Sequence, residues 1–416
     1  MSSRVPVISA ALSLSLSLFT GCAQPMPGDT LMGTVARNME PSTSDLGTLY
    51  AENTGFSLEL LDTVYTAAPG NTLLSPWSLQ VVLAQVYAGG DSAVQAAIAD
   101  TSGWSLSGDA LHEAFDAADL SVVSHDDPAA DLPVTLTSTN QVFSDLNYDI
   151  GADWLNTLSE YYGTGVQQMN LSGDSANSAR AINAWVEDRT GGHIKDLVDA
   201  ESVAASRLLL VNAVYFNASW PVEFSEGRTA PGPFTLLDGS TVDVPTMSGS
   251  VAAYSATGDG FFVADLPYSD RSLTLTIVVP DAGRFAEVLG GLDTATLDTV
   301  VAAETGSDSC EVNLPSFEVS SKPDLNAALQ SMGLGPAYGG AYPGINDELT
   351  VQSIRQQGFV SVNETGTEAA AATVVEMGLG SEPPPCEPIV IDRPFFYLIR
   401  EVGGAVLFTG VVTDPR

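Results

Sequence analysis

One segment near the C-terminus has a composition that would make it a substrate for an enzyme. Residues 362–375, VNETGTEAAAATVV, are mostly small; the alanines favour helix, whereas Thr373 and the two valines after it favour strand. An alanine run of this kind is most simply a surface helix. Here, however, it leads into residues 378–385, GLGSEPPP, where three prolines supply no amide donors. The sequence therefore predicts a long exposed loop whose peptide bonds a protease could cleave.

Residues that could perform catalysis or bind a metal are few and scattered. The histidines are His112, His125 and His193, and the chain has three cysteines. It contains no CxxC pair, no HExxH and no GxSxG motif. We therefore expect no metal, no cofactor and no enzymatic activity. Acidic pairs such as Asp126 and Asp127 are expected to be solvated surface.

The charge balance excludes several classes of partner. The chain of 416 residues has 51 acidic and 14 basic side chains, a formal net charge of −37. Its only lysines are Lys195 and Lys322, so no basic run could hold a polyanion. We expect neither nucleic acid nor an anionic membrane surface as a partner. A hydrophobic fraction of 44% indicates a globular protein.

The N-terminus is typical of an exported protein. Arg4 precedes an apolar run over residues 5–19, too short to span a bilayer and suited to a signal peptide over residues 1–21. The run ends in LFTGC at Cys22, which resembles a bacterial lipobox, although Phe19 stands where leucine is usual. We expect lipidation of Cys22 and anchoring in the bacterial cell envelope or at the cell surface. Simple secretion, or a buried N-terminal helix, are the alternatives.

The remaining chain predicts one α+β domain over residues 49–416, after a flexible tether over residues 22–48 that is rich in proline and glycine. Helical spacing comes early, and short β-rich runs bounded by Gly, Pro or Asp come late. There is no internal repeat and no regular βαβ alternation, so we expect antiparallel or mixed sheets. The helical segments are 58–65, 78–87 after Ser75-Pro76, and 179–198 closing on Gly191-Gly192; the β-rich runs are 207–216, 273–279, 395–400 and 405–412.

Several ordered motifs make the chain resemble the serpin family from about Leu49 to Arg416. Residues 363–373 are similar to the proximal hinge of the reactive-centre loop in inhibitory serpins. The other motifs occur in the family's order: Asn71–Pro76, Val211–Trp220, Val244–Met247, Leu266–Tyr268, Leu314–Phe317, Asp392–Phe395 and Phe408–Gly410. The resemblance implies about eight or nine helices around three β-sheets, with an exposed reactive-centre loop at about residues 364–390.

The resemblance also implies a mechanism, in which a protease cleaves the loop and the freed hinge inserts as a new strand of the central sheet. Insertion requires small side chains on one alternating face and no proline. Thr367, Ala369, Ala371 and Thr373 form such a face, and no proline occurs before Pro383. The expected hinge residues are Glu364, Gly366, Thr367, Glu368, Ala369, Ala370, Ala371, Ala372 and Thr373.

The family's usual loop length places the reactive bond at Gly380-Ser381. The stretch from Ser381 to Pro394 is longer than in common relatives, so cleavage after Leu379 or Met377 is an alternative. None of these residues is basic, whereas a trypsin-like protease requires Arg or Lys in its specificity pocket. We expect elastase-, subtilisin- or chymotrypsin-like targets, each bound in a covalent complex with a monomeric inhibitor.

Other positions match regions that control insertion in the family. Ser75, Ser78 and Asn212 match the shutter, where buried polar groups hold the strands together. Gln356 replaces the usual histidine, so the shutter should respond less to pH. Trp220 matches the breach at the top of the sheet. Ordinary buried hydrogen bonds and a core aromatic are the alternative interpretation of these residues.

The resemblance places Cys310 and Cys386 in neighbouring strands, so they could form a disulfide; free or separately buried thiols are the alternative. The region matching helix D, residues 91–108, has no Lys or Arg, so we expect no activation by heparin. The alternative function is that of a non-inhibitory serpin, a surface binding or scaffold lipoprotein. Such relatives tend to have bulky, charged or proline residues in the hinge.

Overall fold

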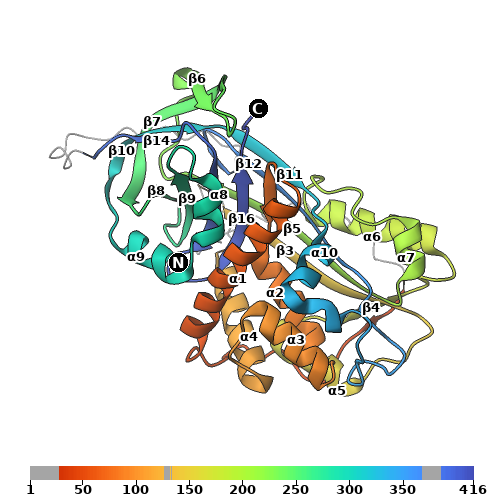
Figure 1. The fold of residues 1–416 in the computed structure, drawn as a ribbon. Helices are drawn as coiled ribbons and strands as arrows, with labels where there is room; N and C mark the ends of the chain where they lie inside the picture. Colours follow the sequence, from red (N-terminus) through yellow and green to blue (C-terminus); the bar gives the residue numbers. More distant parts are fainter. Residues whose placement is uncertain (1–27, 126–131, 133, 368–385) are drawn as a thin grey trace, which may run out of the picture.

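The computed structural model describes residues 28–125, 132, 134–367 and 386–416, which form ten α-helices and two large mixed sheets (Figure 1). The α+β class is confirmed. The helices are α1 (Leu46–Ala67), α2 (Pro76–Tyr87), α3 (Ser92–Ser102), α4 (Gly108–Ser124), α5 (Ala152–Tyr162), α6 (Ser175–Arg189), α7 (Ala200–Ala205), α8 (Phe285–Gly291), α9 (Thr294–Ala302) and α10 (Leu325–Leu329). The count exceeds the eight or nine helices that the resemblance implied, and it includes the short helices α7 and α10, of 6 and 5 residues.

The seven-stranded sheet carries the region expected to accept the loop. Its order is β1-β4-β3-β5-β13-β12-β11. Strands β5 and β12 run parallel to each other, β3 is antiparallel to β5 and parallel to β4, and β11 is antiparallel to β12. The bounds are β1 (Thr30–Leu31), β3 (Val134–Asp145), β4 (Val166–Met169), β5 (Leu208–Ser219), β11 (Phe317–Ser321), β12 (Ile354–Val362) and β13 (Gly366–Thr367).

The resemblance implied two further sheets, but the remaining described strands form a single nine-stranded sheet. Its path is β14-β10-β7-β8-β9-β15-β16-β2, with β6 paired to β7. The 17 residues of β7 pair with β6 and β10 along its length and with β8 at its end, so one strand joins both parts. The bounds are β2 (Thr72–Leu74), β6 (Ala230–Thr235), β7 (Thr241–Thr257), β8 (Phe261–Pro267), β9 (Leu273–Pro280), β10 (Thr305–Pro315), β14 (Ile389–Val390), β15 (Phe395–Glu401) and β16 (Val406–Val412).

Two hydrophobic cores hold the sheets and helices together. The larger core includes α2, all twelve residues of which are buried. The smaller core lies between α6 and the outer face of the seven-stranded sheet, and includes Ile182, Val186 and Val211. Helix α6 therefore covers that face through apolar packing of its own. Across the described residues, none of the helices has the length and apolar character needed to cross a bilayer.

The described part of the expected tether lies on the domain instead of extending from it. Strand β1 pairs with β4, and the Gly33 amide donates to Ser159 Oγ at 2.7 Å. Arg37 forms ion pairs with Asp116 at 2.9 Å and Asp119 at 2.7 Å. Burial raises the pKa of Asp116 to about 6, although Arg37 beside it favours the charged form. Proline and glycine content did not reveal these contacts, because they depend on partners over 70 residues away in the sequence.

Candidate functional site

The seven-stranded sheet is closed at one end of the β5–β12 pair and open at the other. The two strands pair in parallel from Ile354 opposite Leu210 to Phe359 opposite Tyr215. Beyond Phe359 and Tyr215 they diverge, and β13 lies in the opening, antiparallel to both strands. We call this point of divergence the fork. Gly366 and Thr367 thus already occupy the position of an inserted strand.

Gly366 and Thr367 are suited to this entry point. A Cβ atom on Gly366 would lie 2.1 Å from the carbonyl oxygen of Ala218, so only glycine fits. The Thr367 side chain is buried, and its hydroxyl lies 2.6 Å from the hydroxyl of Tyr268. Burial raises the pKa of Tyr268 far above its usual range, so the phenol stays protonated. The inward orientation of Thr367 agrees with the alternating face predicted from the sequence.

The remaining loop predictions fall beyond this point. The structure does not describe residues 1–27 and 368–385, which contain the following predicted site residues: Cys22, Glu368, Ala369, Ala370, Ala371, Ala372, Thr373, Met377, Leu379, Gly380 and Ser381.

Trp220 and Glu364 fix the turn that leads into β13. The Trp220 indole donates to the Asn363 carbonyl at 3.0 Å, and its backbone amide donates to the Thr365 carbonyl at 2.9 Å. Its ring stacks on Tyr268 with centroids 4.8 Å apart. Glu364 accepts a hydrogen bond from Thr229 Oγ1 at 2.6 Å. Trp220 is thus a buried aromatic that also holds the start of the loop.

Below the fork, a buried polar network crosses between the two strands. Gln356 on β12 donates to Asn212 Oδ1 on β5 at 2.8 Å and to the Ser75 carbonyl at 2.9 Å. In return, Gln356 accepts from the Ser75 amide at 2.9 Å. All three residues are at most 3% exposed, so separating the strands would leave their polar groups without partners.

The network continues into α2 and β3. Ser75 caps α2 and donates to the Leu407 carbonyl at 2.7 Å, while its hydroxyl lies 3.0 Å from that of Ser78. Asn212 also donates to Asn140 on β3. The structure therefore brings together the predicted residues Ser75, Ser78, Asn212 and Gln356. The sequence analysis did not single out Asn140, because one asparagine within a β-rich run carries no recognisable signal.

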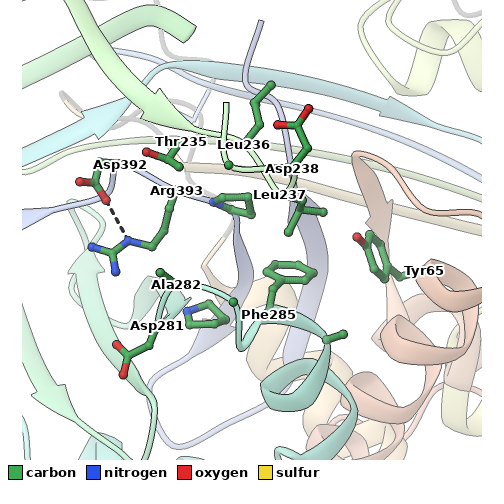
Figure 2. Close-up of a pocket in the computed structure, with 15 residues that line it drawn as sticks. Tyr65, Thr235, Leu236, Leu237, Asp238, Asp281, Ala282, Phe285, Asp392 and Arg393 are labelled. Atoms are coloured by element: carbon green, nitrogen blue, oxygen red, sulfur yellow. Dashed lines mark hydrogen bonds and ion pairs between the residues drawn. The ribbon is translucent and has the colours of Figure 1, made fainter. Parts of the chain in front are cut away.

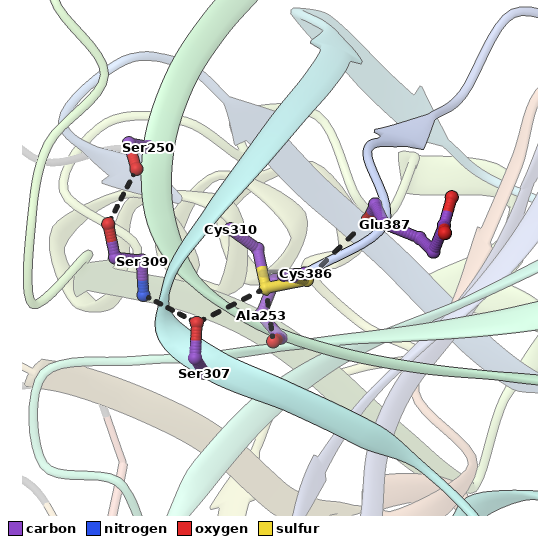
Figure 3. Close-up of a disulfide and its surroundings, with 7 residues drawn as sticks. All are labelled: Ser250, Ala253, Ser307, Ser309, Cys310, Cys386 and Glu387. Atoms are coloured by element: carbon purple, nitrogen blue, oxygen red, sulfur yellow. Dashed lines mark hydrogen bonds between the residues drawn. A yellow bond between two sulfur atoms is a disulfide. The ribbon is translucent and has the colours of Figure 1, made fainter. Parts of the chain in front are cut away.

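The far end of the loop is fastened covalently. Cys310 on β10 and Cys386 form a disulfide with Cα atoms 5.3 Å apart (Figure 3). Cys386 precedes β14, which pairs in parallel with β10 through Val312 and Ile389. Of the two alternatives left open by the sequence, the structure has the bonded pair. Strand β14 is therefore held to β10 by a covalent bond as well as by pairing.

One contact resembles a hydrolase triad but cannot act as one. Ser272 Oγ lies 2.9 Å from Nδ1 of His125, whose Nε2 lies 2.9 Å from Glu401 Oε1. Hydrogen bonds to Asp270 and Glu401 raise the pKa of His125 to about 9. The imidazole is therefore protonated at neutral pH and cannot accept a proton from serine. We interpret it as a bridge between the end of α4 and two turns of the nine-stranded sheet.

A cavity of about 770 Å³ lies away from the fork, between the end of α1, the start of α8 and the start of β15 (Figure 2). Tyr65, Phe285 and Pro394 form apolar walls. Arg393 is already paired with Asp392 at 2.9 Å. This cavity has no contact with the network between β5 and β12, so we do not include it in the candidate site. Among the described residues, no group of three or more His, Cys, Asp or Glu could hold a metal ion.

Comparisons with known proteins agree with this geometry. The family model described as Serpin (serine protease inhibitor) matches residues 51–415. An uncharacterized serpin-like protein of Thermococcus kodakarensis is 30% identical over 355 residues, which cover 83% of this chain and 81% of that protein. The thermophilic serpin tengpin in its native state has a TM-score of 0.80 at 21% identity, over 93% of this chain and 99% of tengpin. Human thyroxine-binding globulin complexed with thyroxine has a TM-score of 0.76 at 26% identity, over 89% and 100% of the two chains.

Proposed function

The chain belongs to the serpin family, and from this premise we propose that it inhibits serine proteases as a suicide substrate. A target protease cleaves the loop after its hinge, and the freed segment extends β13 between β5 and β12 before the acyl-enzyme is hydrolysed. The observation that carries this proposal is the position of β13. Gly366 and Thr367 already pair with both strands, and small residues follow them in the sequence.

The dimensions and energies support trapping of the protease. A strand from Gly366 to Gly380 would span on the order of 50 Å at roughly 3.3 Å per residue. A compact domain of about 370 residues is roughly 54 Å across, so insertion would carry the protease from one pole to the other. Roughly ten new backbone hydrogen bonds and the burial of small side chains would supply on the order of 10 kcal/mol. This energy is sufficient to distort the active site of a bound protease.

The loop sequence supports proteases that prefer small or apolar residues before the cleaved bond. We propose cleavage after Gly380, with Leu379 and Met377 as alternatives, and elastase-, subtilisin- or chymotrypsin-like targets. The protein then acts as an inhibitor and not as an enzyme. The acidic surface of the chain, at net charge −37, favours cationic proteases in the encounter and disfavours nucleic acid and heparin.

The test is formation of a covalent complex that survives SDS. The protein is incubated with pancreatic elastase, subtilisin or chymotrypsin, and with trypsin as the control expected to form none. Sequencing of the C-terminal fragment then identifies the cleaved bond. Because Cys386 lies after that bond and is joined to Cys310, the fragment should leave the complex only under reducing conditions. Hydrolysis of the loop by elastase, subtilisin and chymotrypsin without any complex would contradict inhibition.

A non-inhibitory role as a surface binding protein is the alternative, since thyroxine-binding globulin has the same fold. The hinge argues against it, because residues 369–373 are small and contain no proline. The complex assay separates the two functions directly. A non-inhibitory protein would be cut as a simple substrate at every enzyme ratio.

We further propose that the protein is exported and that a lipid on Cys22 anchors it. We also propose that it is a monomer. The support for export is the signal-like sequence of residues 1–21. Expression in a bacterial host with labelled palmitate should label the wild-type chain, while Cys22→Ser should abolish the label. Equal labelling of both chains, or of neither, would contradict lipidation at this residue.

A further inference from the structure

His193 connects the two strands that meet at the fork. Its ring stacks against Tyr215 on β5, with centroids 5.1 Å apart and planes 10° apart, and against Phe359 on β12, at 4.8 Å and 20°. Tyr215 and Phe359 are the last directly opposed pair before the strands diverge. A single side chain thus contacts both strands at the point where insertion would have to separate them first.

The end of α6 holds His193 in this position. The helix ends at Arg189, and Gly191 and Gly192 adopt φ values of +59° and +88°, which turn the chain back toward the sheet. The buried hydroxyl of Thr190 donates to the Val186 carbonyl at 2.8 Å and accepts from the Ile194 amide at 3.2 Å. The turn on the N-terminal side of His193 is therefore braced by hydrogen bonds.

The chain after His193 is anchored equally well. Asn183 exchanges two hydrogen bonds with the backbone of Val198, at 2.8 and 3.0 Å. Lys322 Nζ donates to the Asp196 carbonyl at 2.9 Å, which ties the loop to the end of β11. Ile194 and Leu197 are buried in the core beneath α6. His193 itself is exposed, so its role is not explained by the core.

We propose that His193 is a positioning residue that holds β5 and β12 together and sets the rate at which the sheet opens; this inference rests on the proposed function. Adjacent strands lie about 4.8 Å apart, so a strand inserted between them would increase their separation to about 9.6 Å. The imidazole could not then keep both contacts. One stacked pair has to be broken before the fork can advance, which adds to the barrier for insertion.

The direct test uses a synthetic peptide of residues 368–379, which would occupy the place of the inserting strand beyond β13. Uptake of fluorescent peptide by the intact protein is followed over time for the wild type and for His193→Ala. We expect uptake on the order of tenfold faster in the variant, a barrier lowered by ~1.4 kcal/mol, as expected for loss of an aromatic contact. Urea unfolding of the same two proteins should show a loss of stability no greater than this ~1.4 kcal/mol, because the contacts that hold the sheet closed also stabilise the folded state.

Two further variants make the result specific. His193→Phe keeps a stacking ring and should take up peptide within about twofold of the wild-type rate. Lys195→Ala, two residues away and exposed, should also match the wild type. Equal uptake by His193→Ala and wild type would overturn the role of His193, and so would fast uptake by His193→Phe. Failure of the wild type to take up any peptide would instead contradict strand insertion itself, and with it the proposed function.

Discussion

The two ends of the reactive-centre loop are held in opposite ways. At the N-terminal end, β13 enters a fork between β5 and β12 that is kept closed only by hydrogen bonds and side-chain contacts. At the C-terminal end, the disulfide from Cys386 to Cys310 fixes the chain beside β14. In the proposed mechanism, the N-terminal end would move into the sheet once the loop is cut, whereas the disulfide would keep the C-terminal end in place.

In the proposed mechanism, this difference would keep the loop from inserting before a protease cuts it. Insertion of the uncut loop requires its C-terminal end to follow, which would pull β14 away from β10. The disulfide opposes that movement, so cleavage is the permitted route to insertion. The polar groups below the fork are satisfied in the closed sheet, and they have to exchange partners when the sheet opens.

The largest expected effect comes from blocking insertion of the N-terminal part of the loop. Ala371 is on the same alternating face as Thr367, which is buried in the structure. Ala371→Arg would place an unpaired charge inside the sheet at a cost of several kcal/mol, so hydrolysis should finish before insertion. We expect the number of inhibitor molecules consumed per protease to rise at least roughly tenfold, since ~1.4 kcal/mol is enough for that change in rate ratio.

Ala370→Arg is the matched control for this prediction. Ala370 lies on the opposite face, where Glu368 already supplies a charge. Titration of a fixed amount of elastase with each variant should show a much smaller change for this control. Equal inhibition by Ala371→Arg and wild type would mean that residue 371 does not enter the sheet.

Freeing the fixed end should have the next largest effect. The disulfide closes a loop of 76 residues, and Cys310→Ser with Cys386→Ser should lower the free energy of unfolding by up to about 4 kcal/mol. More specifically, the variant should lose inhibitory activity during incubation at 45 °C faster than the wild type while remaining folded. The expected product is an uncleaved form with the loop inserted. An unchanged half-life with and without reductant would contradict this role of the disulfide.

Removing the polar network tests the closed part of the fork. Gln356→Leu leaves the Ser75 backbone and Asn212 Oδ1 buried without their partner, which should cost about 2–3 kcal/mol. Gln357→Leu is the control on the other face of the strand, because the Gln357 side-chain oxygen is buried and has no hydrogen-bond partner among the described residues. Urea unfolding should show a large loss for the first variant and little change for the second. The reverse order would contradict the interpretation.

The smallest expected effect is a pH dependence of the free energy of unfolding, which arises at His125 beside the nine-stranded sheet. Asp270 and Glu401 raise the pKa of His125 to about 9, and the side chain is 16% exposed. A raised histidine pKa adds stability below about pH 6.5, and that stability is lost as pH rises through about 9. We expect the free energy of unfolding to fall by about 1–2 kcal/mol between pH 6 and pH 9.5, and the fall to disappear in His125→Gln.

The same experiment sharpens the comparison between the two regions. Gln356 has no titratable group, so the stability that the polar network below the fork contributes should change little over this pH range. A strong pH dependence of uptake that His125→Gln removes would mean that the two sheets are coupled.

Local sequence patterns were sufficient to predict the class of fold and part of the candidate site. The cap at Ser75-Pro76 marked the start of α2, and the β-rich run predicted over residues 207–216 lies almost entirely within β5. The motifs around Asn212 and Gly366 carried family information, so their proximity could be expected. In each case the signal is a short segment that fixes its own conformation or matches a known motif.

Contacts between distant segments without such motifs were not predictable. The segment that includes Arg37 and β1 resembled a linker, because two-residue pairing and single ion pairs leave no periodic pattern. The stack of His193 on Tyr215 and Phe359 depends on the angle at which α6 ends over the sheet. The pairing of Cys310 with Cys386 stayed open because two cysteines alone do not specify their geometry.

The most direct test of the account is the melting temperature of the protein before and after a single cut in its loop. The cut is made with a metalloprotease, which forms no acyl-enzyme and so leaves no trapped partner. Insertion worth on the order of 10 kcal/mol should raise the melting temperature by roughly 10 °C or more. A cut protein that melts at or below the temperature of the intact one would show that the loop does not enter the sheet, and would contradict the proposed mechanism.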